Sequence, residues 1–198
     1  MGSIVVFGAN GRVGRAVAAE ARRRGHEVTA AGRADGDVTD AAAVARLAAG
    51  HDAVVAAVYD PGADPGVFFP AAARALADGT ARAGAGRLVV AGLASVLPTA
   101  DGTLLMDTPD YPQAYRAFYE GHAAGVDALR GPAGGGVDWL VLSPAGDFDH
   151  EGEAGGGYVV APAAAEARIT HADFAAALLD EVERPTHHGV HVGVTSTP

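Results

Sequence analysis

The composition of this 198-residue chain limits its chemistry: it has no cysteine for disulfides, thiolate metal centres or nucleophiles, and its 14 Lys and Arg positions are all arginine. A net charge of −10 argues against nucleic acid as a partner, and no apolar run is long enough to span a membrane. We therefore expect one cytoplasmic domain over residues 1–198, with no lysine chemistry.

The first half of the chain alternates strand-like and helix-like segments. Short apolar runs bounded by turn residues predict strands at Ser3–Phe7, Glu27–Ala31, Ala53–Val58 and Arg87–Ala91. Amphipathic or alanine-rich segments predict helices at Arg12–Arg24, at Ala41–Ala49 after the cap Asp40, and from about Phe69 to Ala83 with Pro70 in the first turn.

The second half continues this alternation less regularly. It predicts a helix from about Pro112 to Leu129, a strand at Val137–Leu142, a short YVV strand, a helix near His171–Val182 and a last strand near Gly189–Val194. Strands separated by helices indicate an α/β fold, a doubly wound parallel sheet with helices on both faces. We expect the irregular residues 95–115 and 144–170 to form a small substrate-side region.

Three glycines follow the first predicted strand directly. The sequence FGANGRVG places Gly8, Gly11 and Gly14 between that strand and the next helix. In such a turn, small residues let the backbone approach a pyrophosphate, and the free N–H groups of the helix face its charge. The G-x-x-G-x-x-G spacing at this position predicts a dinucleotide site in a Rossmann-like fold; a tight turn without a ligand is the alternative.

The end of the second predicted strand indicates which dinucleotide binds. Arg33 stands 19 residues after Gly14. An arginine there accommodates the 2′-phosphate of NADP, whereas an acidic residue binds the 2′-hydroxyl of NAD. Arg12 in the loop adds a second charge. NADP(H) is therefore the preferred cofactor, and Asp35 keeps NAD(H) as an alternative.

A series of segments spread over nearly the whole chain carries a family resemblance: GANGRVG, HEVTAAGR, GDVTD, DAVVAAV, GRLVVAGLASVL, DTPDYP, DWLVLSP and ITHADFAAALLDEVE. Their order resembles the atypical short-chain dehydrogenase/reductases, in particular small NAD(P)H-binding proteins that are NmrA-like or similar to biliverdin-IXβ/flavin reductase. The resemblance implies that Asp37 and Val38 lie beside the adenine, that Ala56 and Ala57 line the cofactor, and that Pro144 lies near the nicotinamide. The expected cofactor residues are thus Gly8, Asn10, Gly11, Arg12, Val13, Gly14, Arg33, Asp37, Val38, Ala56, Ala57 and Pro144.

Two features depart from that family. Only three residues separate Arg33 from Asp37, where the family has a longer connection that carries a further strand. We therefore expect the sheet to lose or shorten a strand. The family's better-known enzymes also use a Tyr-x-x-x-Lys pair, which a chain without lysine cannot form.

Hydride reduction of a carbonyl needs a proton donor near the developing alkoxide. Tyr111, Tyr115 and Tyr119 follow one another at four-residue steps, and a helix would place the last two on one face. We expect Tyr115 to be the acid, Ser95 to orient the substrate, and Tyr111 to be a further candidate at the helix entry. The alternatives are that the rings only pack the helix against the sheet, and that solvent supplies the proton.

These observations predict an NADP(H)-dependent oxidoreductase that reduces a small or aromatic carbonyl, a quinone or a flavin-like acceptor. The alternative is a non-catalytic, NmrA-like redox sensor that binds the cofactor and acts through a protein partner, and the missing lysine favours it. We expect a small-molecule substrate, no metal, no nucleic acid and no membrane partner, with a homodimer as one assembly.

Overall fold

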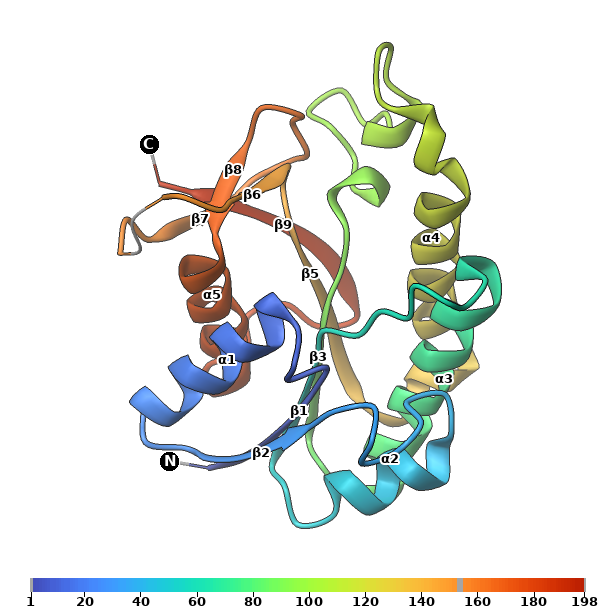
Figure 1. The fold of residues 1–198 in the computed structure, drawn as a ribbon, viewed down its shortest axis with the longest axis vertical. Helices are drawn as coiled ribbons and strands as arrows, with labels where there is room; N and C mark the ends of the chain where they lie inside the picture. Colours follow the sequence, from blue (N-terminus) through green and yellow to red (C-terminus); the bar gives the residue numbers. More distant parts are fainter. Residues whose placement is uncertain (1, 153–154, 198) are drawn as a thin grey trace.

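The computed structural model describes residues 2–152 and 155–197. Seven of the strands formed by these residues make one sheet of order β2-β1-β3-β4-β5-β9-β7 (Figure 1). In chain order the strands are β1 (Ser3–Phe7), β2 (Glu27–Ala31), β3 (Ala53–Ala56), β4 (Arg87–Ala91), β5 (Asp138–Pro144), β6 (Asp147–Asp149), β7 (Tyr158–Val160), β8 (Arg168–Thr170) and β9 (Val190–Ser196).

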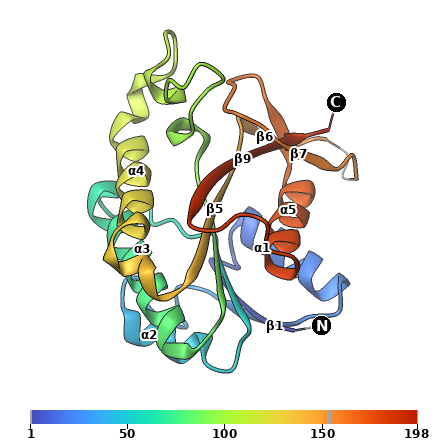
Figure 2. The ribbon, with the colours of Figure 1, turned by 180° about the vertical axis from the view of Figure 1, so that it is seen from behind.

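Helices cover both faces of this sheet (Figures 1 and 2). The α-helices are α1 (Arg12–Arg23), α2 (Ala41–Ala48), α3 (Pro65–Ala83), α4 (Arg116–Arg130) and α5 (His171–Glu183). Single 3₁₀ turns lie at Ala94–Val96, Leu105–Asp107, Gln113–Tyr115 and Pro132–Gly136. Because each helix joins neighbouring or nearby strands by a crossover, most strands run parallel.

Each face of the sheet has its own apolar core. On one face α1 and α5 cover Val6 and Leu140, with Phe174 fully buried between them. On the other face α2, α3 and α4 cover Val54 and Trp139. Strands β1, β3, β4 and β5 are therefore largely buried on both sides, as central parallel strands must be.

The predicted α/β fold is confirmed, with one difference in strand direction. Strand β7 pairs antiparallel with β9 at one edge of the sheet, whereas every other pairing in the described sheet is parallel. At the other edge lies β2, and no described strand pairs outside it. Between β2 and α2 the described residues form no further strand.

Helix α3 begins earlier than the sequence pattern predicts. Its first residue is Pro65 instead of Phe69, because the Asp64 carboxylate accepts a hydrogen bond from the backbone N–H of Val67. Pro70 therefore lies inside the helix and not in its first turn. Either Pro65 or Pro70 could lie in the first turn of this helix, and the helix begins at Pro65 because Asp64 before it is an N-cap residue.

Other elements differ from the prediction near the carboxyl ends of the strands. Helix α4 begins at Arg116 after a 3₁₀ turn instead of at Pro112, and β3 ends at Ala56, two residues early. Strands β6 and β8, which pair parallel in a separate small sheet, were not predicted because each has three residues and no alternating pattern. These differences gather where the loops between strands and helices form the site.

Candidate functional site

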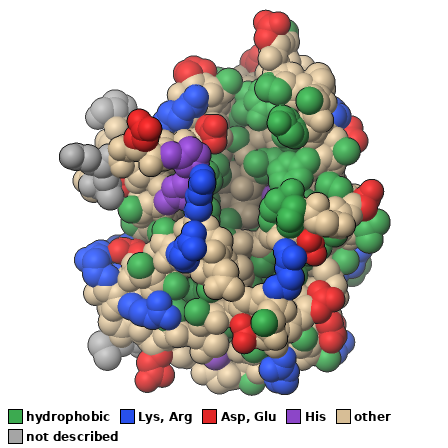
Figure 3. All heavy atoms as spheres, in the orientation of Figure 1, with side chains coloured by type: hydrophobic (Ala, Val, Ile, Leu, Met, Phe, Trp, Pro, Cys, Tyr) green, Lys and Arg blue, Asp and Glu red, His purple; other side chains and the backbone are tan. Residues whose placement is uncertain are grey.

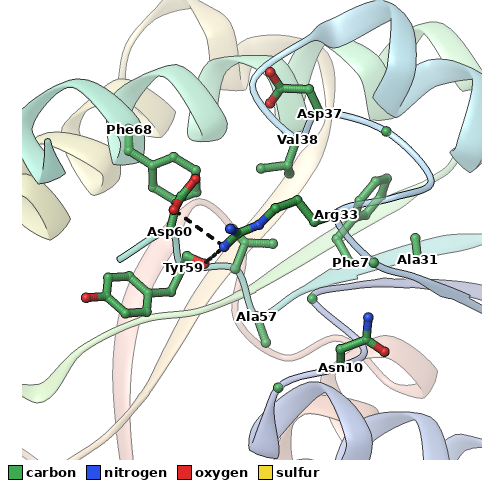
Figure 4. Close-up of a pocket in the computed structure, with 15 residues that line it drawn as sticks. Phe7, Asn10, Ala31, Arg33, Asp37, Val38, Ala57, Tyr59, Asp60 and Phe68 are labelled. Atoms are coloured by element: carbon green, nitrogen blue, oxygen red, sulfur yellow. Dashed lines mark hydrogen bonds and ion pairs between the residues drawn. The ribbon is translucent and has the colours of Figure 1, made fainter. Parts of the chain in front are cut away.

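A cavity of about 610 Å³ opens at the carboxyl ends of β1, β2 and β3. In an open parallel sheet, ligands bind outside this edge of the strands. Figure 4 shows side chains and backbone from the three loops around it. The cavity is lined by Phe7, Gly8, Asn10, Gly11, Ala31, Gly32, Arg33, Gly36, Asp37, Val38, Ala57, Val58, Tyr59, Asp60 and Phe68.

Two of the three glycines shape the turn beneath this cavity. Gly8 has a φ of +77°, and a Cβ there would lie 2.1 Å from the carbonyl oxygen of Ala57. A Cβ on Gly14 would lie 2.1 Å from the carbonyl oxygen of Gly8. Gly11 differs, because the nearest atom to its Cβ would be 3.3 Å away. Gly8 and Gly14 are therefore needed by the fold, whereas Gly11 keeps the space above the turn open.

The N-terminus of α1 points its unpaired N–H groups at this space. Gly11 is the N-cap residue and has no side chain to accept a hydrogen bond. Its own N–H donates to the carbonyl of Gly8, but the N–H groups of Arg12 and Val13 have no acceptor among the residues that the structure describes. Free N–H groups at the positive end of a helix dipole bind phosphate groups. The glycine turn therefore fits the pyrophosphate of a dinucleotide.

Arg33 reaches across the cavity from the end of β2 (Figure 4). Its Nη2 atom lies 3.4 Å from both the Asp60 carboxylate and the carbonyl of Tyr59, so both interactions are long, and its side chain is 69% exposed. The acidic residues nearby are held in local turns. Asp35 accepts a 2.7 Å hydrogen bond from the N–H of Gly32. Asp37 accepts from Thr39, whose N–H lowers the pKa of that carboxyl.

Most of the residues expected to bind the cofactor meet at this cavity. Gly8, Asn10, Gly11, Arg33, Asp37, Val38 and Ala57 line it. The others do not: Gly14 is buried under the turn, Ala56 and Pro144 are buried in β3 and β5, and Arg12 and Val13 lie at the start of α1. Their assignment as cofactor residues stays a prediction.

The lining residues that sequence reasoning missed follow the ends of β1, β2 and β3. Tyr59 and Asp60 come just after β3, and Phe68 is on the first turns of α3. The carboxyl ends of parallel strands meet at one edge, so their position after β3 was the signal that could have found them.

A second, smaller cavity of about 40 Å³ lies between the sheet and α3 and α4. Val58 lines both cavities, and the second one lies at the carboxyl end of β4, where Gly92 is part of its wall. Its wall is apolar apart from His122. Beneath Gly92, the Ser143 hydroxyl and His191 Nε2 form a 2.7 Å hydrogen bond, and burial lowers the pKa of His191 to about 4.

Two aromatic contacts of Phe118 build a wall beside these cavities. Phe118 packs edge-on against Tyr59 with ring centroids 5.3 Å apart, and against Phe69 at 5.5 Å. Figure 3 shows the molecule hollowed on this face, with hydrophobic side chains on one rim and histidine and basic side chains on the other. His150 and His171 stack at 5.2 Å, and burial followed by the charges of His150 and Arg12 lowers the pKa of His171.

The three residues expected to be catalytic do not meet at one point. Tyr115 is 64% exposed, just before α4, and lines neither cavity. Ser95 is completely buried, and its hydroxyl has no hydrogen-bond partner among the described residues, so it cannot orient a substrate in this conformation. Tyr111 is half-buried against Tyr119 at 5.4 Å, and burial followed by that neighbour raises the pKa of Tyr111 to about 12.

The comparisons with known proteins agree with this geometry. A family model described as NAD(P)H-binding matches residues 31–185, which is most of the chain. The chain belongs to the NAD(P)H-binding family. A nicotinamide cofactor, expected from the glycine turn, follows from this membership, and the expected recognition of an NAD(P)H-binding family is confirmed.

Relatives of this family cover the whole chain. The Bacillus subtilis protein YwnB is 35% identical over 213 residues, 98% of each chain. A Streptococcus pneumoniae protein described as a candidate NADH-flavin reductase is 28% identical, with full coverage of both chains and a TM-score of 0.85. A candidate epimerase from Bacteroides thetaiotaomicron is also 28% identical, covers 99% of this chain and 97% of its own, and has a TM-score of 0.80.

Two further kinds of site were sought in residues 2–152 and 155–197. No helix in these ranges combines the length and apolarity needed to cross a membrane. The same residues bring together no group of three or more His, Asp or Glu side chains that could hold a metal ion.

Proposed function

We propose that this protein is an NADP(H)-dependent reductase of a planar aromatic carbonyl, a quinone or a flavin-like acceptor. The observation that carries the proposal is the cavity at the carboxyl edge, with the free N–H groups of α1 on one side and Arg33 on another. The family supplies a nicotinamide cofactor, and the remaining features support a choice among cofactors and acceptors.

The charges around the end of β2 favour NADP(H) over NAD(H). Arg33 is held only by two 3.4 Å contacts, so a 2′-phosphate can replace Asp60 as its partner at little cost. A phosphate carries more charge than a carboxylate and suits the planar guanidinium fork. Asp35 and Asp37, which would otherwise bind the 2′-hydroxyl of NAD, already accept hydrogen bonds from Gly32 and Thr39.

The residues of the chain position the cofactor in three places. The N–H groups at the start of α1 bind the pyrophosphate, and Arg33 binds the 2′-phosphate. Val58 lines both cavities, which supports a nicotinamide end that points toward Gly92 and β4. When bound, the reduced nicotinamide supplies a hydride, and the protein acts by orienting it and excluding water.

The aromatic wall favours a planar acceptor. The ring of Tyr59 lines the cofactor cavity and packs edge-on against that of Phe118, so this pair offers stacking contacts to a flat conjugated molecule. A quinone or a flavin has this shape and takes up a hydride without a strong protein acid, which suits a chain without lysine. The description of the Streptococcus pneumoniae neighbour as a flavin reductase supports the same class of acceptor.

The substitution Arg33→Ala tests the cofactor assignment. Steady-state reduction of menadione and of FMN is measured with NADPH and with NADH, and the exposed Arg22→Ala on α1 is the control. We expect kcat/KM for NADPH to fall roughly 10- to 100-fold, since a charged hydrogen bond contributes about 1.5–3 kcal/mol, and kcat/KM for NADH to stay within about twofold. An equal loss for both cofactors would contradict the assignment.

The positions of Tyr115 and Ser95 favour one second candidate, a redox sensor that binds the cofactor without catalysis. The side chain of Tyr115 is exposed to solvent and that of Ser95 is fully buried, so neither offers a proton to a substrate in this conformation. Tight NADPH binding with no reduction of quinones, flavins or aromatic aldehydes would favour this candidate over the reductase.

A further inference from the structure

The imidazole of His122 is held rigidly at the inner end of the site. Its ring centroid lies 3.7 Å from that of Phe69 on α3 and 4.8 Å from that of Phe118, one turn earlier on α4. Gly121 lets the two helices approach closely, because a Cβ there would lie 2.6 Å from the backbone of Pro65. Neither ring contact leaves the imidazole free to swing into solvent.

His122 faces the small cavity with no other polar partner. It lines this cavity together with Val58, which also lines the cofactor cavity, and with Gly92 just after β4. Its nitrogens make no hydrogen bond to any residue that the structure describes, whereas the nearby Ser143 and His191 satisfy each other. The side chain of His122 is only partly buried, and its ring nitrogens are not among the fully buried polar atoms of the described residues that lack a partner. These nitrogens therefore stay accessible, and a ligand in the cavity can contact them.

The charge state of His122 makes it a neutral hydrogen-bond donor. Burial, followed by the neighbouring His191 on β9, lowers the pKa of His122 to about 3. At neutral pH one ring nitrogen therefore carries a proton and the other accepts. A neutral donor in a water-poor pocket stabilises a charge that appears during reaction without requiring a charge of its own beforehand.

We propose that His122 donates a hydrogen bond to the acceptor oxygen on which negative charge develops during reduction. The inference rests on the proposed reductase function. In an aromatic carbonyl, the hydride forms a C–H bond at the carbonyl carbon while the π pair of the C=O bond moves onto the oxygen. In a quinone, the hydride forms an O–H bond at one carbonyl oxygen, and the electron pair moves through the ring onto the opposite oxygen. The oxygen that gains the charge, which His122 contacts, then takes a proton from solvent. NADPH is oxidised to NADP⁺ in this step. His122 contacts the reacting oxygen and is thus a catalytic residue for which Tyr111 and Tyr115 do not substitute.

The substitution His122→Phe keeps the ring stack with Phe69 and Phe118 and removes the N–H donor. With NADPH and menadione we expect kcat to fall on the order of 10²-fold, and the Kd for NADPH to stay within about twofold. His122→Gln restores an N–H donor, so it should recover part of kcat. The matched control is His188→Phe, which should leave kcat unchanged. His188 is exposed and lies just before β9, at the amino-terminal end of the strands and away from the site.

Two outcomes of this experiment would overturn the inference. If kcat of His122→Phe stays within about twofold of the wild type, His122 is only a packing residue. If its NADPH affinity falls instead of kcat, His122 contacts the cofactor and not the acceptor. The proposed function fails separately, when the wild type itself binds NADPH but reduces no acceptor.

A measurement without turnover tests the same contact. The protein is labelled with ¹⁵N-histidine, and His122→Gln identifies the ring signals of His122. We expect these signals to move when menadione is added to the NADP⁺ complex and to move little when NADP⁺ is added alone. A shift with NADP⁺ alone, or no shift with menadione, would contradict the hydrogen bond to the acceptor.

Discussion

Polar groups at the amino-terminal end of the sheet are paired with other protein groups, whereas several at its carboxyl end have no protein partner among the described residues. At the amino-terminal end, Arg87 of β4 is buried, donates to Glu181 of α5 at 3.1 Å, and lies 2.8 Å from Asp138 of β5. It also donates to the carbonyl of His187 at 2.8 Å. At the carboxyl end, the first N–H groups of α1 and the imidazole of His122 have no partner among the described residues.

This contrast separates the residues that stabilise the fold from those left available to a ligand. A buried charge is tolerated only when it is paired, so the Arg87 network stabilises the fold only while it is complete. Unpaired groups cost stability in the free protein and gain their partners when the cofactor and acceptor bind. Substitutions at the amino-terminal end should therefore change stability, and those at the carboxyl end should change binding or turnover.

The largest expected effect is on stability at the amino-terminal end. Arg87→Met leaves the Glu181 carboxylate buried without its cation, so we expect the free energy of unfolding to fall by about 3–5 kcal/mol. Urea denaturation followed by circular dichroism measures it. The control Arg82→Met breaks an exposed pair with Asp78 and should cost less than about 0.5 kcal/mol. A loss below 1 kcal/mol in Arg87→Met would contradict the contrast.

Acid should weaken the same network. Burial raises the pKa of Glu181, but hydrogen bonds from Thr186 and His187 outweigh it and lower the pKa to about 2, below its ordinary 4.5. The resulting stabilisation, about 3 kcal/mol, is present above pH 4.5 and is lost as the pH falls toward 2. Unfolding free energies measured between pH 6 and 2 should show this loss. Glu181→Gln should be less stable at pH 6, with a flatter pH dependence.

Two substitutions in the glycine turn should have different effects, one on cofactor binding and the other on folding. Gly11→Val should weaken NADPH binding at least about 100-fold, or about 2.7 kcal/mol, because the branched side chain stands where the pyrophosphate approaches. The backbone of Gly11 tolerates a side chain, with a φ of −75°. Gly14→Val should instead prevent folding, since its Cβ would clash with the Gly8 carbonyl. NADPH binding retained in Gly11→Val would place the cofactor elsewhere.

The tyrosines give the smallest expected change. Tyr111→Phe should change kcat by less than about threefold, because its ring lines neither cavity and solvent supplies the proton. Tyr115→Phe should have a smaller effect still, since its ring is 64% exposed. Steady-state kinetics with NADPH and menadione compares the two. A loss of 10²-fold in Tyr115→Phe would show that Tyr115 moves into the site and is the acid, as the sequence alone suggests.

The sequence predicts the fold well where a short apolar run has clear limits. Strands β1, β2 and β4 agree with the prediction to the residue, and Asp40 caps α2 as expected. The glycine turn is readable for the same reason, since its position after β1 determines its role. The start of α3 was missed because a turn-rich loop conceals the Asp64 cap.

The acceptor side of the site is harder to predict from sequence. Tyr115 and Ser95 have suitable chemistry, but their exposure and burial depend on how residues 92–115 pack above the sheet. His122 is one histidine in an alanine-rich helix, and only the packing of α4 on α3 places it beside a cavity. Its four-residue spacing from Phe118 is the one local signal, and core packing produces that spacing equally well.

Calorimetric titration of the cofactor-free protein with NADPH and with NADH tests the central claim most directly. We predict one site per chain, with NADPH bound at least tenfold more tightly than NADH, and no measurable heat with Gly11→Val. Equal affinities would contradict the role of Arg33. Failure of the wild type to bind either dinucleotide would contradict the assignment of the carboxyl edge as the cofactor site.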